Sequence, residues 1–148
     1  MDKDYLIIES GADLFRVVID DIMYFESDHN YSHVHLTNSK SDLVSLQLGK
    51  ISELIDGQLK KNGRAFVRIG NRLIVNTQYI YKIDVAKQEL ILMAGYKGKS
   101  SDYSIYKVEV ALKPNHEFTM KDECITCKLK ASKDALRDLK NKIKDGKI

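Results

Sequence analysis

Arg64, Arg68 and Arg72 recur every four residues within a segment that is rich in cationic side chains. From Lys60 to Lys82 the sequence has six Lys or Arg residues and no Asp or Glu. Guanidinium and ammonium groups bind phosphate, and a guanidinium can also donate two hydrogen bonds to O6 and N7 of guanine. The segment therefore indicates a polyanion as the partner.

Charge is divided unevenly along the chain. Residues 1–59 hold 4 Lys/Arg and 11 Asp/Glu, a net charge of −7, whereas residues 60–148 hold 20 and 10, a net charge of +10. We expect one side of the protein to repel phosphate and the other side to attract it. Arg137 and Lys140 add to the basic C-terminal stretch, where a solvated helix face is the commoner explanation and phosphate contact the alternative.

Short apolar or alternating runs fill most of the chain, and Gly, Asn, Asp and Ser separate them. This pattern predicts a mainly β fold of antiparallel hairpins and a meander. Residues 66–69 and 73–76 form one such pair of strands, with Gly70-Asn71 in the turn. No strand is followed by the long helical crossover that a parallel sheet needs.

Two segments predict helices. In residues 50–61 the apolar side chains follow the spacing of one buried helix face, although Gly57 should limit the helix to one or two good turns. A second helix is expected at about 132–145, with Ser132 as its N-cap and a buried seam of Leu136, Leu139 and Ile143.

Length and composition limit the class of protein. With 148 residues, of which 43% are hydrophobic, the chain should form a single domain over residues 1–148. Residues 96–123 combine a polar turn, a long alternating strand and a Pro-Asn turn, and we predict an inserted hairpin there. The sequence has no apolar run of membrane-spanning length and no signal peptide, which predicts a cytoplasmic protein.

A histidine cluster offers the main metal-binding alternative. His33 and His35 should project to the same face of a strand, where two imidazoles could bind zinc with His29 or Asp28 as a third ligand. Polar-face histidines on a half-exposed strand explain the pattern more simply, and no motif of a metalloprotease, P-loop enzyme, serine hydrolase or dinucleotide-binding enzyme occurs. We expect no metal, no cofactor, no small-molecule substrate and no enzymatic activity.

Three separated motifs follow one another between Phe15 and Leu92. They are Ile22-Met23-Tyr24-Phe25-Glu26 with Asn30-Tyr31 after a polar turn, Ser45-Leu46 before the first helix, and Phe66-Val67-Arg68-Ile69, Gly70-Asn71-Arg72 and Leu73-Ile74-Val75-Asn76. In order and spacing they resemble the LytTR DNA-binding domain of bacterial response regulators. Residues 129–143 resemble its C-terminal part weakly.

The chain departs from the family pattern in two places. Family members usually have His, then Arg or Lys, then Ser in the turn that Gly70, Asn71 and Arg72 occupy here. They also reach a final Ser-Arg and helix soon after the strand equivalent to residues 89–93, whereas residues 96–123 intervene here and Ser132-Lys133 has Lys in place of Arg.

The resemblance implies an elongated, mostly antiparallel β fold whose loops enter the major groove of double-stranded DNA. Members commonly bind as pairs to direct repeats, so it implies a sequence-specific transcriptional regulator that could act as a homodimer. Many members carry a phospho-receiver of about a hundred residues before this domain. Only about 14 residues precede the match here, and we expect a stand-alone regulator.

The resemblance and the hydrogen-bonding chemistry together assign roles to the polar residues. Arg68 and Arg72 suit guanine, Asn30 and Asn71 suit adenine N6 and N7, and Lys133 can reach guanine as a point charge. The predicted phosphate contacts, which give affinity without sequence choice, are Lys60, Lys61, Arg64, Lys82, Arg137 and Lys140.

Each role has a structural alternative. Arg68 could pair with Glu26 on the sheet surface, Asn71 could serve only the turn, and Asn76 is expected to bind backbone groups. If Arg68 faces outward, strand parity puts Phe66 on the same face, exposed unless a loop or partner chain covers it. The alternative function is a β-rich protein-interaction or oligomerisation module in which the basic turn meets an acidic partner.

Overall fold

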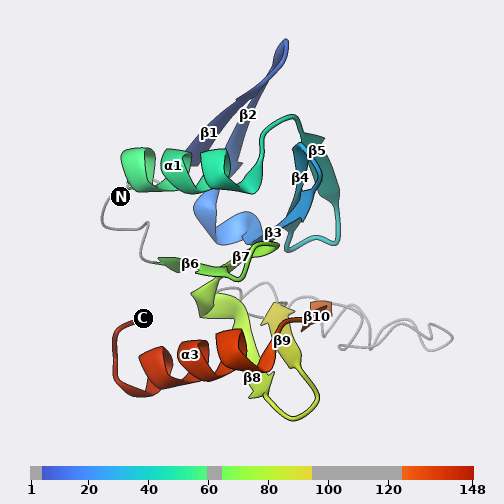
Figure 1. The fold of residues 1–148 in the computed structure, drawn as a ribbon. Coiled ribbons are helices and arrows are strands. Elements are labelled where there is room, and N and C mark those ends of the chain that lie inside the picture. Colours follow the sequence, from blue (N-terminus) through green and yellow to red (C-terminus); the bar gives the residue numbers. More distant parts are fainter. Residues whose placement is uncertain (1–4, 60–64, 95–124) are drawn as a thin grey trace, which may run out of the picture.

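A five-stranded antiparallel sheet forms the centre of the molecule (Figure 1). The computed structural model describes residues 5–59, 65–94 and 125–148. The strand order is β5-β4-β3-β7-β6, so β3 pairs with β4 and, on its other side, with β7 from beyond the first helix. The strands are β3 (Ile22–Asp28), β4 (Tyr31–Leu36), β5 (Ser41–Val44), β6 (Phe66–Ile69) and β7 (Leu73–Asn76). The prediction of a mainly β, antiparallel fold is confirmed.

Smaller elements cover both faces of this sheet. On one side lie α1 and the β1–β2 hairpin, and on the other lie α3 and a three-stranded sheet of order β10-β9-β8 (Figure 1). These elements are β1 (Tyr5–Ser10), β2 (Asp13–Val18), α1 (Leu48–Leu59), β8 (Ile80–Asp84), β9 (Glu89–Ala94), β10 (Ile125–Lys130) and α3 (Lys133–Lys144). The predicted hairpin at 96–123 lies outside the described residues.

The middle of the central sheet, at β3 and β7, is buried on both faces, which explains the position of Phe66 on the adjoining β6. Phe66 is 9% exposed and packs in the core under α1, where its ring lies 6.1 Å from that of Phe25. Val67 and Ile69 pack in a second cluster of buried residues, on the side of the sheet that faces α3. Arg68 faces outward, as the alternation of side chains along the strand allows. Phe66 shares that face, but α1 covers it, so no loop or partner chain is needed.

The first helix begins earlier than predicted. It starts at Leu48, two residues before the expected start at Lys50, and spans Leu48–Leu59 within the described residues. The backbone oxygen of Gln47 accepts hydrogen bonds from the amides of Lys50 and Ile51, at 3.0 and 3.2 Å, and so starts the helix early. The helix continues through Gly57 because its apolar face packs against the core.

The second helix begins as predicted. The Ser132 hydroxyl accepts a hydrogen bond from the Ala135 amide at 3.1 Å, which confirms the N-cap. Leu136 and Leu139 are buried, but Ile143 is 38% exposed, so the buried seam is shorter than predicted. No helix in the described part of the chain is long and apolar enough to cross a membrane.

Candidate nucleic-acid interface

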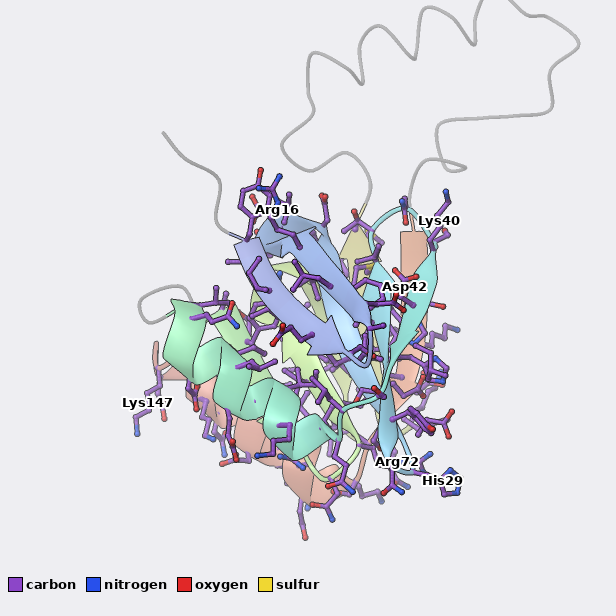
Figure 2. The ribbon with its side chains drawn as sticks, turned by 90° about the horizontal axis from the view of Figure 1, so that it is seen from above. Arg16, His29, Lys40, Asp42, Arg72 and Lys147 are labelled. Carbon is purple, nitrogen blue, oxygen red and sulfur yellow. The ribbon has the colours of Figure 1, made fainter. Side chains whose placement is uncertain are left out.

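Two turns lie next to each other at one end of the central sheet. The amide of Ser27, near the end of β3, donates to the backbone oxygen of Arg72 in the β6–β7 turn at 2.8 Å. Figure 2 shows Arg72 and His29, which lies in the β3–β4 turn, at this same end, whereas Arg16 and Lys40 lie at the opposite end. We call the end that carries the turns at 29–30 and 70–72 the turn end.

The β6–β7 turn presents its polar side chains to solvent. Gly70 has a φ of +60°, a left-handed conformation that glycine adopts without strain. Asn71 and Arg72 are exposed. Arg68 is also exposed, beside the first turn of α1, where its Nη1 lies 4.0 Å from the position that a Cβ on Gly49 would take. The β6–β7 hairpin therefore presents two guanidinium groups on the surface, Arg68 from β6 and Arg72 from the turn.

Neither guanidinium forms an ion pair within residues 5–59, 65–94 and 125–148. The alternative in which Arg68 pairs with Glu26 is wrong, because Glu26 accepts a hydrogen bond from His35 instead. Arg68 and Arg72 are consequently available to an anionic or hydrogen-bond-accepting partner.

Asn30 is exposed in the β3–β4 turn and has a partner that the sequence did not reveal. Its Oδ1 accepts a hydrogen bond from Gln47 Nε2 at 2.8 Å. Gln47 lies 17 residues away along the chain, directly before α1. The only sequence signal for Gln47 was its position just ahead of the apolar face of α1, and the expected start of that helix was two residues too late.

Asp28 joins two of the histidines at the turn end. Its Oδ1 lies 3.0 Å from His29 Nδ1 and its Oδ2 lies 2.9 Å from His33 Nε2. These two hydrogen bonds, first that from His29 and then that from His33, hold the pKa of the Asp28 carboxyl below its usual value. Both oxygens of this carboxylate thus have imidazole partners.

His35 has separate partners. Its Nε2 lies 3.2 Å from Glu26 Oε1, and its ring stacks on Tyr24 with centroids 4.2 Å apart. His33 and His35 share a face as predicted, with ring centroids 5.9 Å apart, but their nitrogens bind different carboxylates. Within the described residues no group of three or more His, Cys, Asp or Glu side chains could hold a metal ion.

The N-terminal end of α3 points toward the turn end of the molecule, while its C-terminal end lies near Lys147 (Figure 2). Lys133, the first residue of α3, is exposed, and so are Lys140 and, on β8, Lys82. Arg137 forms an exposed ion pair with Asp134 at 3.4 Å. Lys60, Lys61 and Arg64 lie outside the described residues.

Acidic and basic residues are not separated in space as the sequence suggested. The pairing of β3 with β7 places the acidic end of β3, with Asp28, beside the turn that carries Arg72. The expectation of one repelling and one attracting side was therefore too simple.

One family model matches most of the chain. The model of the LytTr DNA-binding domain family matches residues 12–113, more than half of the chain. A solved LytTr DNA-binding domain from Bacillus cereus is similar at 20% identity over 62% of this chain and 78% of that chain, with a TM-score of 0.44. The comparison with curated proteins gave no match.

Proposed function

Because the chain belongs to the LytTr DNA-binding domain family, we propose that it is a transcriptional regulator that recognises a specific double-stranded DNA sequence through its turn end. The observation that carries the proposal is the position of Arg72: exposed, unpaired among the described residues, and hydrogen-bonded through its backbone to the adjoining strand. Because the Arg72 backbone is already fixed, binding to a base edge has to order the side chain alone.

Sequence readout in this proposal comes from side chains near the turn end. Arg72 and Arg68 donate to guanine O6 and N7, Asn71 and Asn30 contact base edges from the two turns, and Lys133 approaches from the start of α3. Phosphate contacts position the domain. We assign them to Lys82, Arg137 and Lys140, together with Lys60, Lys61 and Arg64.

Two further features belong to the proposal. Since members of the family commonly bind as pairs, we propose that two copies occupy direct repeats, with the turn end of each copy in a major groove. Residues 1–148 would then act as one DNA-binding unit that includes 96–123, in the cytoplasm and without catalytic activity.

The proposal is tested first by binding to random-sequence duplexes across a salt series. For a DNA-binding domain, log K should fall linearly with log salt, by about 0.9 for each phosphate that the protein neutralises. Binding to no duplex at any salt concentration would refute the proposal and favour the protein-interaction module.

The division between base and phosphate contacts is tested with Arg72→Ala and Lys140→Ala. We expect Arg72→Ala to weaken binding to a selected site by about 1 to 3 kcal/mol and to relax the preference at one position. Lys140→Ala should weaken all duplexes alike and reduce the salt slope by about 1. Selection of bound sequences from random duplexes measures the first effect, and equal losses on every sequence for both variants would contradict the assignment.

A further inference from the structure

The hydrogen bond between Gln47 and Asn30 joins two exposed side chains at the turn end. Gln47 Nε2 donates to Asn30 Oδ1 at 2.8 Å, linking the start of α1 to the β3–β4 turn. An asparagine on an exposed turn can usually rotate its carboxamide and offer either its oxygen or its nitrogen to a partner. Here Gln47 determines whether the oxygen or the nitrogen of Asn30 points toward a ligand.

The backbone around Gln47 is held on both sides. The Gln47 carbonyl accepts the first hydrogen bonds of α1, from Lys50 and Ile51. The preceding carbonyl, of Leu46, accepts a 2.7 Å hydrogen bond from the hydroxyl of Ser32, which is fully buried in β4. Gln47 therefore extends toward Asn30 from a fixed stretch of backbone, and its hydrogen bond sets the orientation of the Asn30 carboxamide in the structure.

The preset orientation limits what Asn30 can recognise. A carboxamide has an accepting oxygen and a nitrogen with two donor hydrogens. Because the Asn30 oxygen is turned to Gln47, its nitrogen points away from Gln47 and offers its donor hydrogens to a ligand. Adenine offers an acceptor at N7 and a donor at N6, so its pairing with asparagine requires both groups, whereas guanine offers two acceptors, O6 and N7.

We propose that Gln47 is a positioning residue for base readout, which holds Asn30 as a donor-only group and so makes it select guanine over adenine. This inference rests on the proposed function and revises the expectation, from the sequence, that Asn30 pairs with adenine. It adds to the interface a residue whose side chain acts through Asn30 and need not touch DNA.

The test begins by locating the base that Asn30 contacts. Sequences are selected from random duplexes with the wild-type chain and with Asn30→Ala. The position at which Asn30→Ala loses its preference marks the contact, and the wild-type protein should prefer guanine there over adenine by about tenfold, the size of one good base contact.

The deciding variant is Gln47→Glu. A glutamate side chain at this position can only accept at neutral pH, so the Asn30 carboxamide should turn over, donate to the new carboxylate and present its oxygen outward. The preference at the contacted position should then shift by about tenfold toward adenine or cytosine, whose edges carry the N6 and N4 donors. Gln47→Ala leaves the Asn30 carboxamide free to rotate. It should reduce the preference for guanine without creating a preference for another base.

Lys50→Gln is the matched control for charge. It removes one positive charge from the first turn of α1, the same change in net charge as Gln47→Glu, and Lys50 contacts Glu53 at 3.6 Å instead of Asn30. We expect it to weaken all duplexes alike while the guanine preference stays. Thermal unfolding of each variant confirms that the fold is retained.

The outcomes separate this inference from the proposed function. A shift of preference with Gln47→Glu but not with Lys50→Gln supports it. Selective DNA binding in which Asn30→Ala affects no position, or in which the Gln47 variants keep the wild-type preference, overturns the inference and leaves the proposed function standing. Absence of any duplex binding by the wild-type chain overturns both.

Discussion

At the scale of single residues, His35 is held in an environment that disfavours its charged form. Its ring is half-buried and stacks on Tyr24. Burial lowers the pKa of His35 below its usual 6.5, and this effect outweighs the hydrogen bond to Glu26, which raises the pKa. The unfolded chain therefore binds a proton at this position more readily than the folded chain does.

This pKa shift predicts a loss of stability in mild acid. The folded-state pKa of His35 is depressed. The contribution of neutral His35 to the free energy of unfolding is therefore fully present above the unfolded pKa near 6.5, and it is lost as the pH falls through the lower folded pKa. The free energy of unfolding of the wild type should decrease on going from about pH 7.5 to about pH 5.5. Urea unfolding at a series of pH values measures this decrease.

His35→Phe is the informative variant. Phenylalanine keeps a ring against Tyr24 but cannot titrate, so the decrease in mild acid should be smaller than in the wild type. His29→Gln serves as the control, since the His29 side chain is 93% exposed. Because the pKa of Asp28 is lowered, the contribution of its carboxylate to the free energy of unfolding is lost only in stronger acid, below the range from about pH 7.5 to about pH 5.5. An unchanged pH dependence in His35→Phe would contradict the assignment.

Individual residues could be predicted from sequence where their partners are local. Asn76 was expected to bind backbone groups, and its local bond, accepted from the Gln78 amide at 3.2 Å, confirms this. Its second bond, donated to the Ile22 oxygen at 2.9 Å, joins residues that are 54 positions apart. The partner of Asn30 could not be predicted in this way. The contact with Gln47 depends on where α1 begins and on how the β3–β4 turn lies against it, which are both tertiary features.

At the scale of secondary-structure elements, two glycines with open surroundings have opposite roles. Gly57 lies in the exposed face of α1 and Gly70 lies in the β6–β7 turn with a φ of +60°. A Cβ added at either position would meet no atom within 4 Å. Substitution by alanine therefore tests the backbone conformation alone, without a steric clash.

We expect Gly57→Ala to raise the free energy of unfolding by about 0.5 to 1 kcal/mol, since glycine inside a helix is less favourable than alanine. Gly70→Ala should lower it by about 1 to 2 kcal/mol, because an L-residue is strained in the left-handed region. The midpoints of urea unfolding, at unchanged slope, measure both effects. Changes of the same sign would contradict this account of the two elements.

The elements themselves were largely predictable, and their arrangement was not. Alternating apolar residues identified the strands of the central sheet because side-chain period is a local property. The start of α1 at Leu48 depends on the Gln47 carbonyl, and the pairing of β3 with β7 joins segments that are far apart in sequence. Phe66 illustrates the consequence, since its burial could be understood only once α1 was seen to cover that face.

At the scale of the whole molecule, the position of a charge should matter more than the net charge. The chain has a net charge of +3, and its acidic and basic residues meet at the turn end, where Asp28 adjoins the turn that carries Arg72. Salt at physiological ionic strength screens exposed charges beyond about 8 Å. Attraction to DNA should therefore come from the cationic groups that directly face it.

Lys40→Ala and Arg72→Ala provide the corresponding test, because each removes one positive charge. Lys40 lies at the end of the molecule opposite Arg72 (Figure 2). If the turn end binds DNA, Lys40→Ala should keep the affinity and the salt slope of the wild type, whereas Arg72→Ala should lose affinity by about 1 to 3 kcal/mol. Fluorescence anisotropy with one labelled duplex across a salt series measures both. Equal losses in the two variants would mean that net charge, and not the turn end, drives the binding.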